Sequence, residues 1–356
     1  MIRSMAPATA RLVSARSLVP SRFLALALAT LLGCETNADE ASGPHMSAAS
    51  SAEVREAPSE QASPDAKRQA LLHAAGFGKL ADAQRLLDAG ADPDARARDT
   101  RGRTALILAA AGGHLDVVDA LLTHGATVDE KDRTGHTALN WAAMRGRGEV
   151  VARLLSGGAD INTQNNAGVS PLLYSVGTKN HEMVELLATR GAKLDVESRE
   201  NKMTPLLLAI EHHDLESIRI LLDRGAEIDA KNGDGVSALM AAADKGQTDV
   251  AQLLLSRGAD PNIRDPKGRT PLMRAAIQGR AKMIKVLYAG GADPNARNAN
   301  GRTALMLATA AGKPGSVPAL LECGADTGAK DRDGATALML AKKLDRHRIV
   351  ELLQAR

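Results

Sequence analysis

The sequence predicts an all-α protein in which short helix-turn-helix units are stacked into a solenoid. Apolar residues make up 44% of the chain but aromatic residues only 1%, so the predicted core consists of small aliphatic side chains that suit closely stacked helices. A hydroxyl residue followed by a small residue or proline and then leucine recurs at steps of 33 residues, with a single step of 34. A fixed period of this length is typical of repeat proteins, in which neighbouring units share one continuous core. The repeated hydroxyl residues are Thr104, Thr137, Ser170, Thr204, Ser237, Thr270, Thr303 and Thr336.

The first segment, residues 1–33, is predicted to be a signal peptide. Its arginines give residues 1–34 a charge of +4, because no acidic residue occurs there. The stretch 23–33 is apolar apart from Thr30, and a bilayer span needs about 20 residues. The length instead fits the apolar region of a secretory signal.

Residues 34–65 are predicted to form a disordered tether. Large apolar side chains are nearly absent, and Ala, Ser, Glu and Pro dominate, so little surface could be buried to offset the entropy of ordering. Seven acidic residues against Arg55 give residues 35–65 a charge of −6. The acidic residues are Glu35, Asp39, Glu40, Glu53, Glu56, Glu60 and Asp65.

One repeat shows how the units are expected to fold. Thr270 stands where a helix N-cap is expected, with Pro271 at the first helical position. A short helix should follow and end at Gly279, and a second helix should cover 281–289. Either Gly290 or Gly291 should supply the left-handed residue after it. The residues up to Gly301 then predict a β-hairpin-like finger.

Nine such units are expected over residues 66–356. The first is a weaker copy that starts near Gln69 and is set off by a two-residue insertion in 95–103. The last stops soon after its second helix, and Lys342, Lys343 and Arg346 suit a solvated end unit.

The repeats resemble the ankyrin repeat family. The family's Thr-Pro-Leu opening stands at 204–206 and 270–272, and Gly-Ala-Asp-Pro-Asn stands at 258–262 and 291–295. The segment Gly-Gly-His-Leu-Asp-Val-Val at 112–118 matches the link between the two helices. The resemblance implies a right-handed solenoid with a concave groove lined by fingers and first helices. It also implies a protein that binds other proteins without doing chemistry. One departure is consistent: the family's opening-helix histidine is absent from every full unit, so apolar packing should carry more of the cohesion.

Leu31-Leu32-Gly33-Cys34 resembles the lipobox of bacterial lipoproteins. This resemblance implies that Cys34 receives a lipid through its nucleophilic thiol and becomes the first residue of the mature chain. The expected location is then the bacterial cell envelope, on the periplasmic or surface side, where the lipid anchor holds the protein at the membrane. Soluble export after cleavage and mitochondrial import remain alternatives, because an arginine- and serine-rich leader without acids also fits a transit peptide.

No enzyme motif occurs in the sequence, so catalytic residues, cofactors and a metal site are not expected. The neighbours His212 and His213 would face different directions on a helix, which is poor geometry for a metal. Cys323 is predicted to be a half-exposed, unreactive thiol. A net charge of +3 with interspersed acids argues against nucleic-acid binding.

The candidate binding residues surround two aromatic side chains. Trp141 and Tyr174 are 33 residues apart and so occupy the same place in adjacent units, expected to look toward the groove. Trp, Tyr and Arg dominate binding hot spots. The alternative is that both rings fill gaps between units. The predicted partner-binding set is Trp141, Tyr174, Met144, Arg145, Arg103, His136 and Met203.

The sequence therefore predicts a monomeric interaction scaffold with a protein partner in the envelope or periplasm. Two other roles fit the same features: an exported effector that binds a host or competitor protein, and a protector or activator of a periplasmic enzyme.

Overall fold

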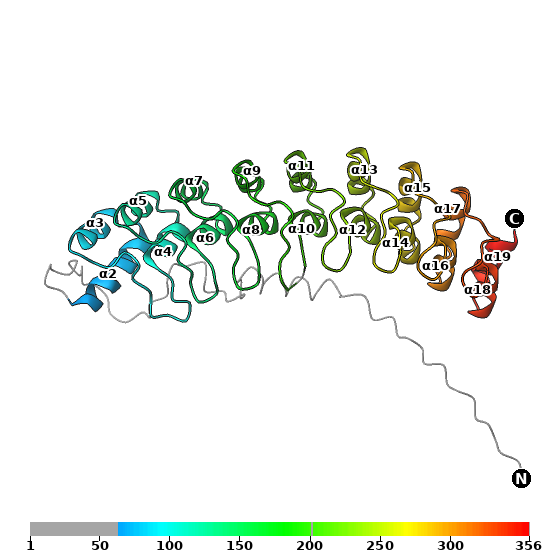
Figure 1. The fold of residues 1–356 in the computed structure, drawn as a ribbon, viewed down its shortest axis with the longest axis horizontal. Coiled ribbons are helices and arrows are strands. Elements are labelled where there is room, and N and C mark those ends of the chain that lie inside the picture. Colours follow the sequence, from blue (N-terminus) through cyan, green and yellow to red (C-terminus); the bar gives the residue numbers. More distant parts are fainter. Residues whose placement is uncertain (1–62, 201, 356) are drawn as a thin grey trace, which may run out of the picture. The chain divides into compact units, whose positions relative to one another are not determined.

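The computed structural model describes residues 63–200 and 202–355, all within one compact unit, Ser50–Arg356. The predicted signal peptide, Cys34 and most of the predicted tether lie outside the described residues. The described part contains 18 helices that form nine pairs, as predicted (Figure 1). Each first helix packs against the first helices of the neighbouring units, which produces one layer, and the second helices form another.

The first helices of the pairs are α2 (Pro64–Phe77), α4 (Ala105–Gly112), α6 (Ala138–Met144), α8 (Pro171–Gly177), α10 (Pro205–Glu211), α12 (Ala238–Lys245), α14 (Pro271–Gln278), α16 (Ala304–Ala310) and α18 (Ala337–Lys343). The second helices are α3 (Leu80–Asp88), α5 (Leu115–Thr123), α7 (Gly148–Ser156), α9 (His181–Thr189), α11 (Leu215–Asp223), α13 (Thr248–Ser256), α15 (Ala281–Ala289), α17 (Ser316–Glu322) and α19 (His347–Gln354).

The repeated hydroxyl residues are the N-caps of the first helices. Thr104, for example, accepts a hydrogen bond from the backbone N–H of Ile107, and the other seven act in the same way. Such a bond satisfies one of the four N–H groups that have no partner inside the helix. In the unit that begins at Thr270, Gly279 ends α14 with a φ of 79° and Gly291 follows α15 with a φ of 94°, as expected for left-handed caps.

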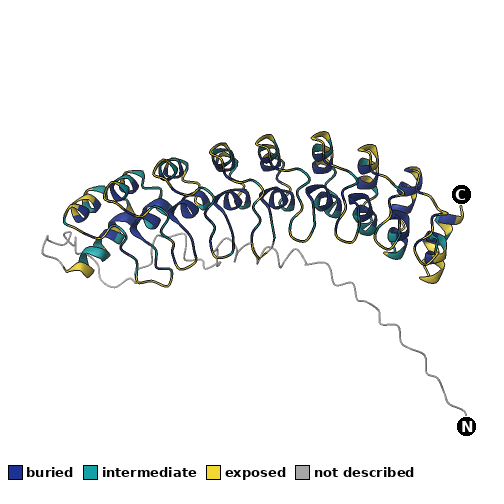
Figure 2. Cartoon of the chain, in the orientation of Figure 1, coloured by how far each residue is buried: buried dark blue, intermediate teal, exposed yellow. Residues whose placement is uncertain are grey.

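Burial differs between the two layers. Figure 2 shows that the first helices between the two ends of the array are buried around most of their circumference, whereas the second helices have one exposed face. In α8, the side chains of Leu172, Leu173 and Val176 are all at most 2% exposed. In α7, only Val150, Val151 and Leu154 are buried, at the spacing of one helix face. The core is thus shared between units, because a single pair cannot cover its own first helix.

Each finger between the pairs is closed by a backbone hydrogen bond, such as that from Asp265 N to Arg269 O at 3.0 Å. One isolated antiparallel bridge, between Arg96 and Thr104, is found in the described residues. Most fingers also carry an Asp or Asn whose oxygen accepts from the backbone N–H groups two and four residues later. Asp265, for example, accepts from Lys267 N at 2.9 Å and from Arg269 N at 2.8 Å. Asp or Asn is well suited to this role because its short side chain reaches its own turn.

Backbone hydrogen bonds also join the tips of neighbouring fingers. Arg133 N donates to Arg101 O at 2.9 Å and Asn166 N donates to Thr134 O at 3.2 Å, and the same bond recurs at Arg199, Ala299 and Arg332. The equivalent donors beside the fifth finger, residues 231–236, behave differently. Gly233 N donates to the Glu197 carboxylate at 2.8 Å, and Pro266 has no N–H to donate. The fifth finger therefore has no such backbone bond to the sixth. Side chains also join it to the fourth finger, where Asn232 Nδ2 donates to Lys202 O at 3.0 Å and Lys202 Nζ lies 2.7 Å from Asp234 Oδ1.

No helix in the described residues combines the length and apolar character needed to cross a membrane. The same residues hold no group of three or more His, Cys, Asp or Glu side chains arranged for a metal ion. Cys323 is 4% exposed, which corrects the expectation of a half-exposed thiol, and burial is the main cause that raises its pKa. Cys323 is the C-cap residue of α17, and its backbone N–H donates to Ala319 O at 3.1 Å.

Candidate protein-binding site

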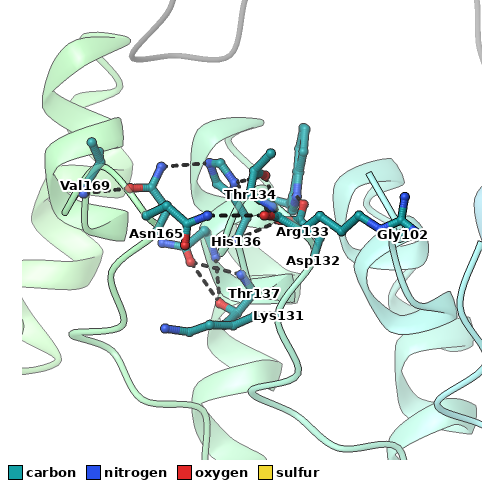
Figure 3. Close-up of polar contacts among 12 residues, drawn as sticks. Gly102, Lys131, Asp132, Arg133, Thr134, His136, Thr137, Asn165 and Val169 are labelled. Atoms are coloured by element: carbon teal, nitrogen blue, oxygen red, sulfur yellow. Dashed lines mark hydrogen bonds and ion pairs between the residues drawn. The ribbon is translucent and has the colours of Figure 1, made fainter. Parts of the chain in front are cut away.

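Asp132, in the second finger, organises a buried hydrogen-bond network between two units (Figure 3). Its Oδ1 accepts from the backbone N–H groups of Thr134 and His136 at 2.9 and 3.0 Å, and from the Thr134 hydroxyl at 2.6 Å. Its Oδ2 accepts from the indole N–H of Trp141, at the middle of α6, at 3.0 Å. The Asp132 side chain itself is 0% exposed.

The network continues into the next unit through a histidine and a tyrosine. His136 Nδ1 lies 2.7 Å from the Thr134 hydroxyl oxygen, and its Nε2 lies 2.6 Å from the hydroxyl of Tyr174 in α8. Asn165, in the third finger, donates from Nδ2 to the same Tyr174 oxygen at 2.8 Å and accepts at Oδ1 from Val169 N at 2.9 Å. The contacts thus connect two fingers and two helices.

The hydrogen-bond partners determine where the protons sit. A carboxylate only accepts, so Thr134 donates its single hydroxyl proton to Asp132. The Thr134 oxygen then accepts from His136 Nδ1–H, which places a proton on that ring nitrogen. The Tyr174 oxygen lies 2.6 Å from His136 Nε2 and accepts from Asn165 Nδ2.

Two pKa values reflect this arrangement. Burial by itself raises the pKa of Asp132, but the hydrogen bonds from His136, Thr134 and Trp141 outweigh burial and hold the pKa well below its usual range. Burial, together with the nearby Asp132 charge, raises the pKa of Tyr174 well above its usual value. Asp132 is therefore a carboxylate and Tyr174 a neutral phenol at all ordinary pH values.

Two arginines of the first finger cover the Trp141 ring. The guanidinium carbons of Arg101 and Arg103 lie 5.6 and 5.8 Å from the ring centroid, within the range of cation–π attraction. The centroid of the His136 ring lies 5.4 Å from that of the Trp141 ring. Trp141 is consequently only 4% exposed, although it belongs to the layer of first helices.

The predicted binding residues fall into two groups. Trp141, Tyr174, His136 and Arg103 are brought together, but Tyr174 is fully buried and Trp141 and His136 are nearly so. The rings of Trp141 and Tyr174 lie in the interior of the array, as the alternative expectation has it. Their role in binding a partner stays a prediction.

The other three predicted residues lie outside the network. Met144 ends α6 and is half-buried, and the exposed Arg145 is the C-cap of that helix. Met203 is half-buried in the fourth finger, where its backbone N–H donates to Ser198 Oγ at 3.2 Å. None of the three joins the hydrogen bonds described above.

Sequence reasoning missed Asp132, Thr134 and Asn165. Their spacing could have predicted these contacts, because Asp132 precedes Trp141 by nine residues and Asn165 precedes Tyr174 by nine. The same spacing links Asp265 to Arg274, whose Nη1 lies 3.3 Å from Asp265 Oδ2. A polar residue at this place in the first helix thus pairs with its own finger, which fixes the finger against the helix.

A pH titration provides a check of the Asp132 environment. Its folded-state pKa lies below the unfolded value of about 3.9, so the stability that Asp132 adds is present above that value and is lost as the pH falls through the folded-state pKa. We expect the emission of Trp141, the single tryptophan, to stay unchanged down to about pH 4 and to change only at lower pH. Fluorescence against pH measures this, with Asp132→Asn as control, because its amide should remove the acid transition. A Trp141 titration centred on the ordinary carboxyl pKa would contradict the assignment.

Comparison with known proteins agrees with this architecture. The profile of a family described as "Ankyrin repeats (3 copies)" matches residues 71–165, 153–232, 225–298 and 288–356. The chain belongs to the ankyrin repeat family. Members of this family are generally scaffolds for protein–protein interaction and typically have no enzymatic activity.

A solved structure supports the same conclusion. The chain is similar to the ankyrin repeat domain of Bcl-3, described as a unique member of the IkappaB protein family, with 33% sequence identity and a TM-score of 0.57. The match covers 62% of this chain and 100% of the Bcl-3 chain. No curated protein matched the sequence significantly.

Proposed function

We propose that the repeat array recognises a protein partner of the bacterial cell envelope through its fingers and first helices. The buried network around Asp132 carries this proposal, because it holds two fingers and two helices in one arrangement before any partner arrives. A preformed surface loses less conformational entropy on binding than a flexible one. Exposed side chains such as Arg133 and Arg145 stand at the edge of this rigid region and supply the contacts.

Crosslinking capture with the full chain in extracts of the source organism tests the partner proposal. Arg133→Glu combined with Arg145→Glu should reduce recovery of the main crosslinked protein at least several-fold, since exposed arginines are frequent hot spots. Arg332→Glu is the matched control, because Arg332 occupies the place of Arg133 in the last finger. Equal recovery with wild type, the double variant and the control would reject this face as the binding site.

We further propose that Cys34 carries a lipid that holds the array at a membrane. The support is the sequence: an apolar stretch too short to span a bilayer ends in Leu-Leu-Gly-Cys, and acidic sequence begins directly afterwards. Labelled palmitate should be incorporated by the wild-type chain and lost in Cys34→Ser. Cys323→Ser, at the other cysteine of the chain, should retain the label. Incorporation that persists in Cys34→Ser would defeat the lipid-anchor proposal and favour soluble export or mitochondrial import.

A further inference from the structure

The first finger is the most basic of the eight fingers in the described chain. Residues 96–103 contain four arginines and one aspartate, a net charge of +3, whereas 164–169, 197–203 and 231–236 each sum to zero. Two further fingers, 264–269 and 297–302, reach +2. Arg133 of the second finger joins this region, because its Nη1 donates to the backbone O of Asp99 at 3.0 Å. We call Arg98, Arg101, Arg103 and Arg133 the arginine cluster.

Carboxylates of the described residues compensate part of this charge. Arg96 forms an ion pair with Glu130, Asp99 lies 3.3 Å from Arg103, and the nearby Asp132 is buried and already accepts four hydrogen bonds. Arg133 donates to backbone carbonyl oxygens, which leave its positive charge in place. Stacking on Trp141 holds Arg101 and Arg103 in position, which favours planar, two-pronged recognition of a carboxylate.

The structure already contains one such recognition. Arg98, whose side chain is 69% exposed, binds Asp65 through both guanidinium nitrogens, at 2.7 and 2.8 Å. Asp65 lies in the first turn of α2, directly after the acidic segment 35–62, which has six acidic residues and one arginine and a charge of −5. The acidic segment is therefore covalently joined, through Asp65, to a contact with the arginine cluster, and its charge is opposite to that of the cluster.

We propose that the arginine cluster is a docking surface for acidic polypeptide and that its resident occupant is the chain's own segment 35–62. Chain length permits the contact. Glu60 and Glu56 lie five and nine residues before Asp65, and an extended chain covers about 3.3–3.6 Å per residue. Covalent attachment gives the segment an effective concentration of about millimolar order, so a partner must compete with it for the same arginines. The proposal goes beyond partner recognition and does not depend on the lipid anchor.

The single tryptophan beneath Arg101 and Arg103 serves as the reporter. A nitroxide attached to the Ser59→Cys variant of the full chain, with Cys34→Ser, should quench Trp141 emission at about 20 mM salt and lose most of that effect at about 500 mM, because salt screens exposed charge pairs. The same label in diamagnetic form gives the reference intensity. A labelled chain without Ser59→Cys corrects for any reaction at the buried Cys323.

Substitutions that remove single charges test which residues hold the segment on the arginine cluster. The triple variant Glu53→Gln, Glu56→Gln and Glu60→Gln should lower the docked population about tenfold, since three exposed pairs act together. Arg133→Gln should reduce the quenching, whereas Arg332→Gln, at the same place in the last finger, should leave it unchanged. A synthetic peptide of residues 35–62 that carries the nitroxide at position 59 should quench Trp141 when it is added to the unlabelled triple variant.

Three results would overturn the proposal. One is an absence of quenching at low salt with the label at position 59 and, separately, at Ser51. Another is quenching whose extent is the same at low and high salt and is unchanged by the glutamine substitutions. The third is quenching that rises with protein concentration, which would assign the occupant to a second copy of the chain. A failed search for an envelope partner would affect none of these measurements, so the two proposals can be rejected separately.

Discussion

Asp132→Ala is expected to destabilise the array by about 3 kcal/mol or more, as an order-of-magnitude estimate. The substitution removes a buried carboxylate that accepts from Thr134, from the backbone of His136 and from Trp141. Hydrogen bonds to charged groups contribute about 1.5–3 kcal/mol each, and donors left buried without a partner add their own desolvation cost. Denaturant unfolding followed by circular dichroism measures the free energy of unfolding.

The matched control is Asp331→Ala in the last finger. Asp331 accepts from the backbone N–H groups of Asp333 and Ala335 in the same way, and Arg302 Nε lies 3.1 Å from its Oδ2 in place of an indole. We expect a smaller loss there, about 1.5–3 kcal/mol, because Asp331→Ala removes the closure of the turn and the contact with Arg302 but no bond to an indole or a hydroxyl. Equal losses for the two variants would show that the bonds of Asp132 to Trp141 and Thr134 add no stability.

Ile210→Ala is expected to cost about 2–5 kcal/mol and to separate unfolding into two steps. Ile210 is fully buried in α10, which packs against α8 on one side and α12 on the other. The neighbouring fifth finger has no tip-to-tip backbone bond to the sixth, because Pro266 lacks an N–H, so helix packing carries more of the coupling between the two halves. In a repeat array, a local loss of coupling lets the parts unfold separately.

Two probes distinguish one transition from two. Trp141 fluorescence reports on the first half of the array, whereas circular dichroism reports on all helices. In wild type the two urea transitions should coincide, and in Ile210→Ala their midpoints should separate. Ile210→Val should cost about 0.5–1.5 kcal/mol, and Met339→Ala, at a side chain 57% exposed, should cost nearly nothing. Coincident transitions in Ile210→Ala would show that the array stays a single cooperative unit.

The sequence was sufficient to predict the helices because the local chemistry that starts and ends them repeats. Thr270, Pro271 and Gly279 act as predicted, and the same residue types occur at the same places along the array. The step of 34 residues also has a clear location. In the fourth finger, Ser198 accepts from Met203, five residues later instead of four, so the extra residue lies in the finger and leaves the helices in register.

The surroundings of the two aromatic rings could not be predicted in the same way. The spacing of 33 residues correctly placed Trp141 and Tyr174 at equivalent positions of adjacent units. It could not show that residues of the fingers cover these positions. Arg101 and Arg103 come from the preceding unit and cover the Trp141 ring. The hydrogen bond between His136 and Tyr174 joins residues 38 positions apart. Whether a side chain lies in contact with solvent depended on these neighbours.

The sequence by itself determined the number of units, the caps of the first helices and the family. These features follow from residue identity and period, because capping, turn formation and apolar spacing act over a few residues. The tertiary structure alone decided that Trp141, His136 and Tyr174 are buried, that Asp132 connects two units and that side chains join the fifth finger to the fourth. These features depend on which side chains meet across the stack, whereas a local change such as Pro266 only removes one backbone donor between the fifth and sixth fingers.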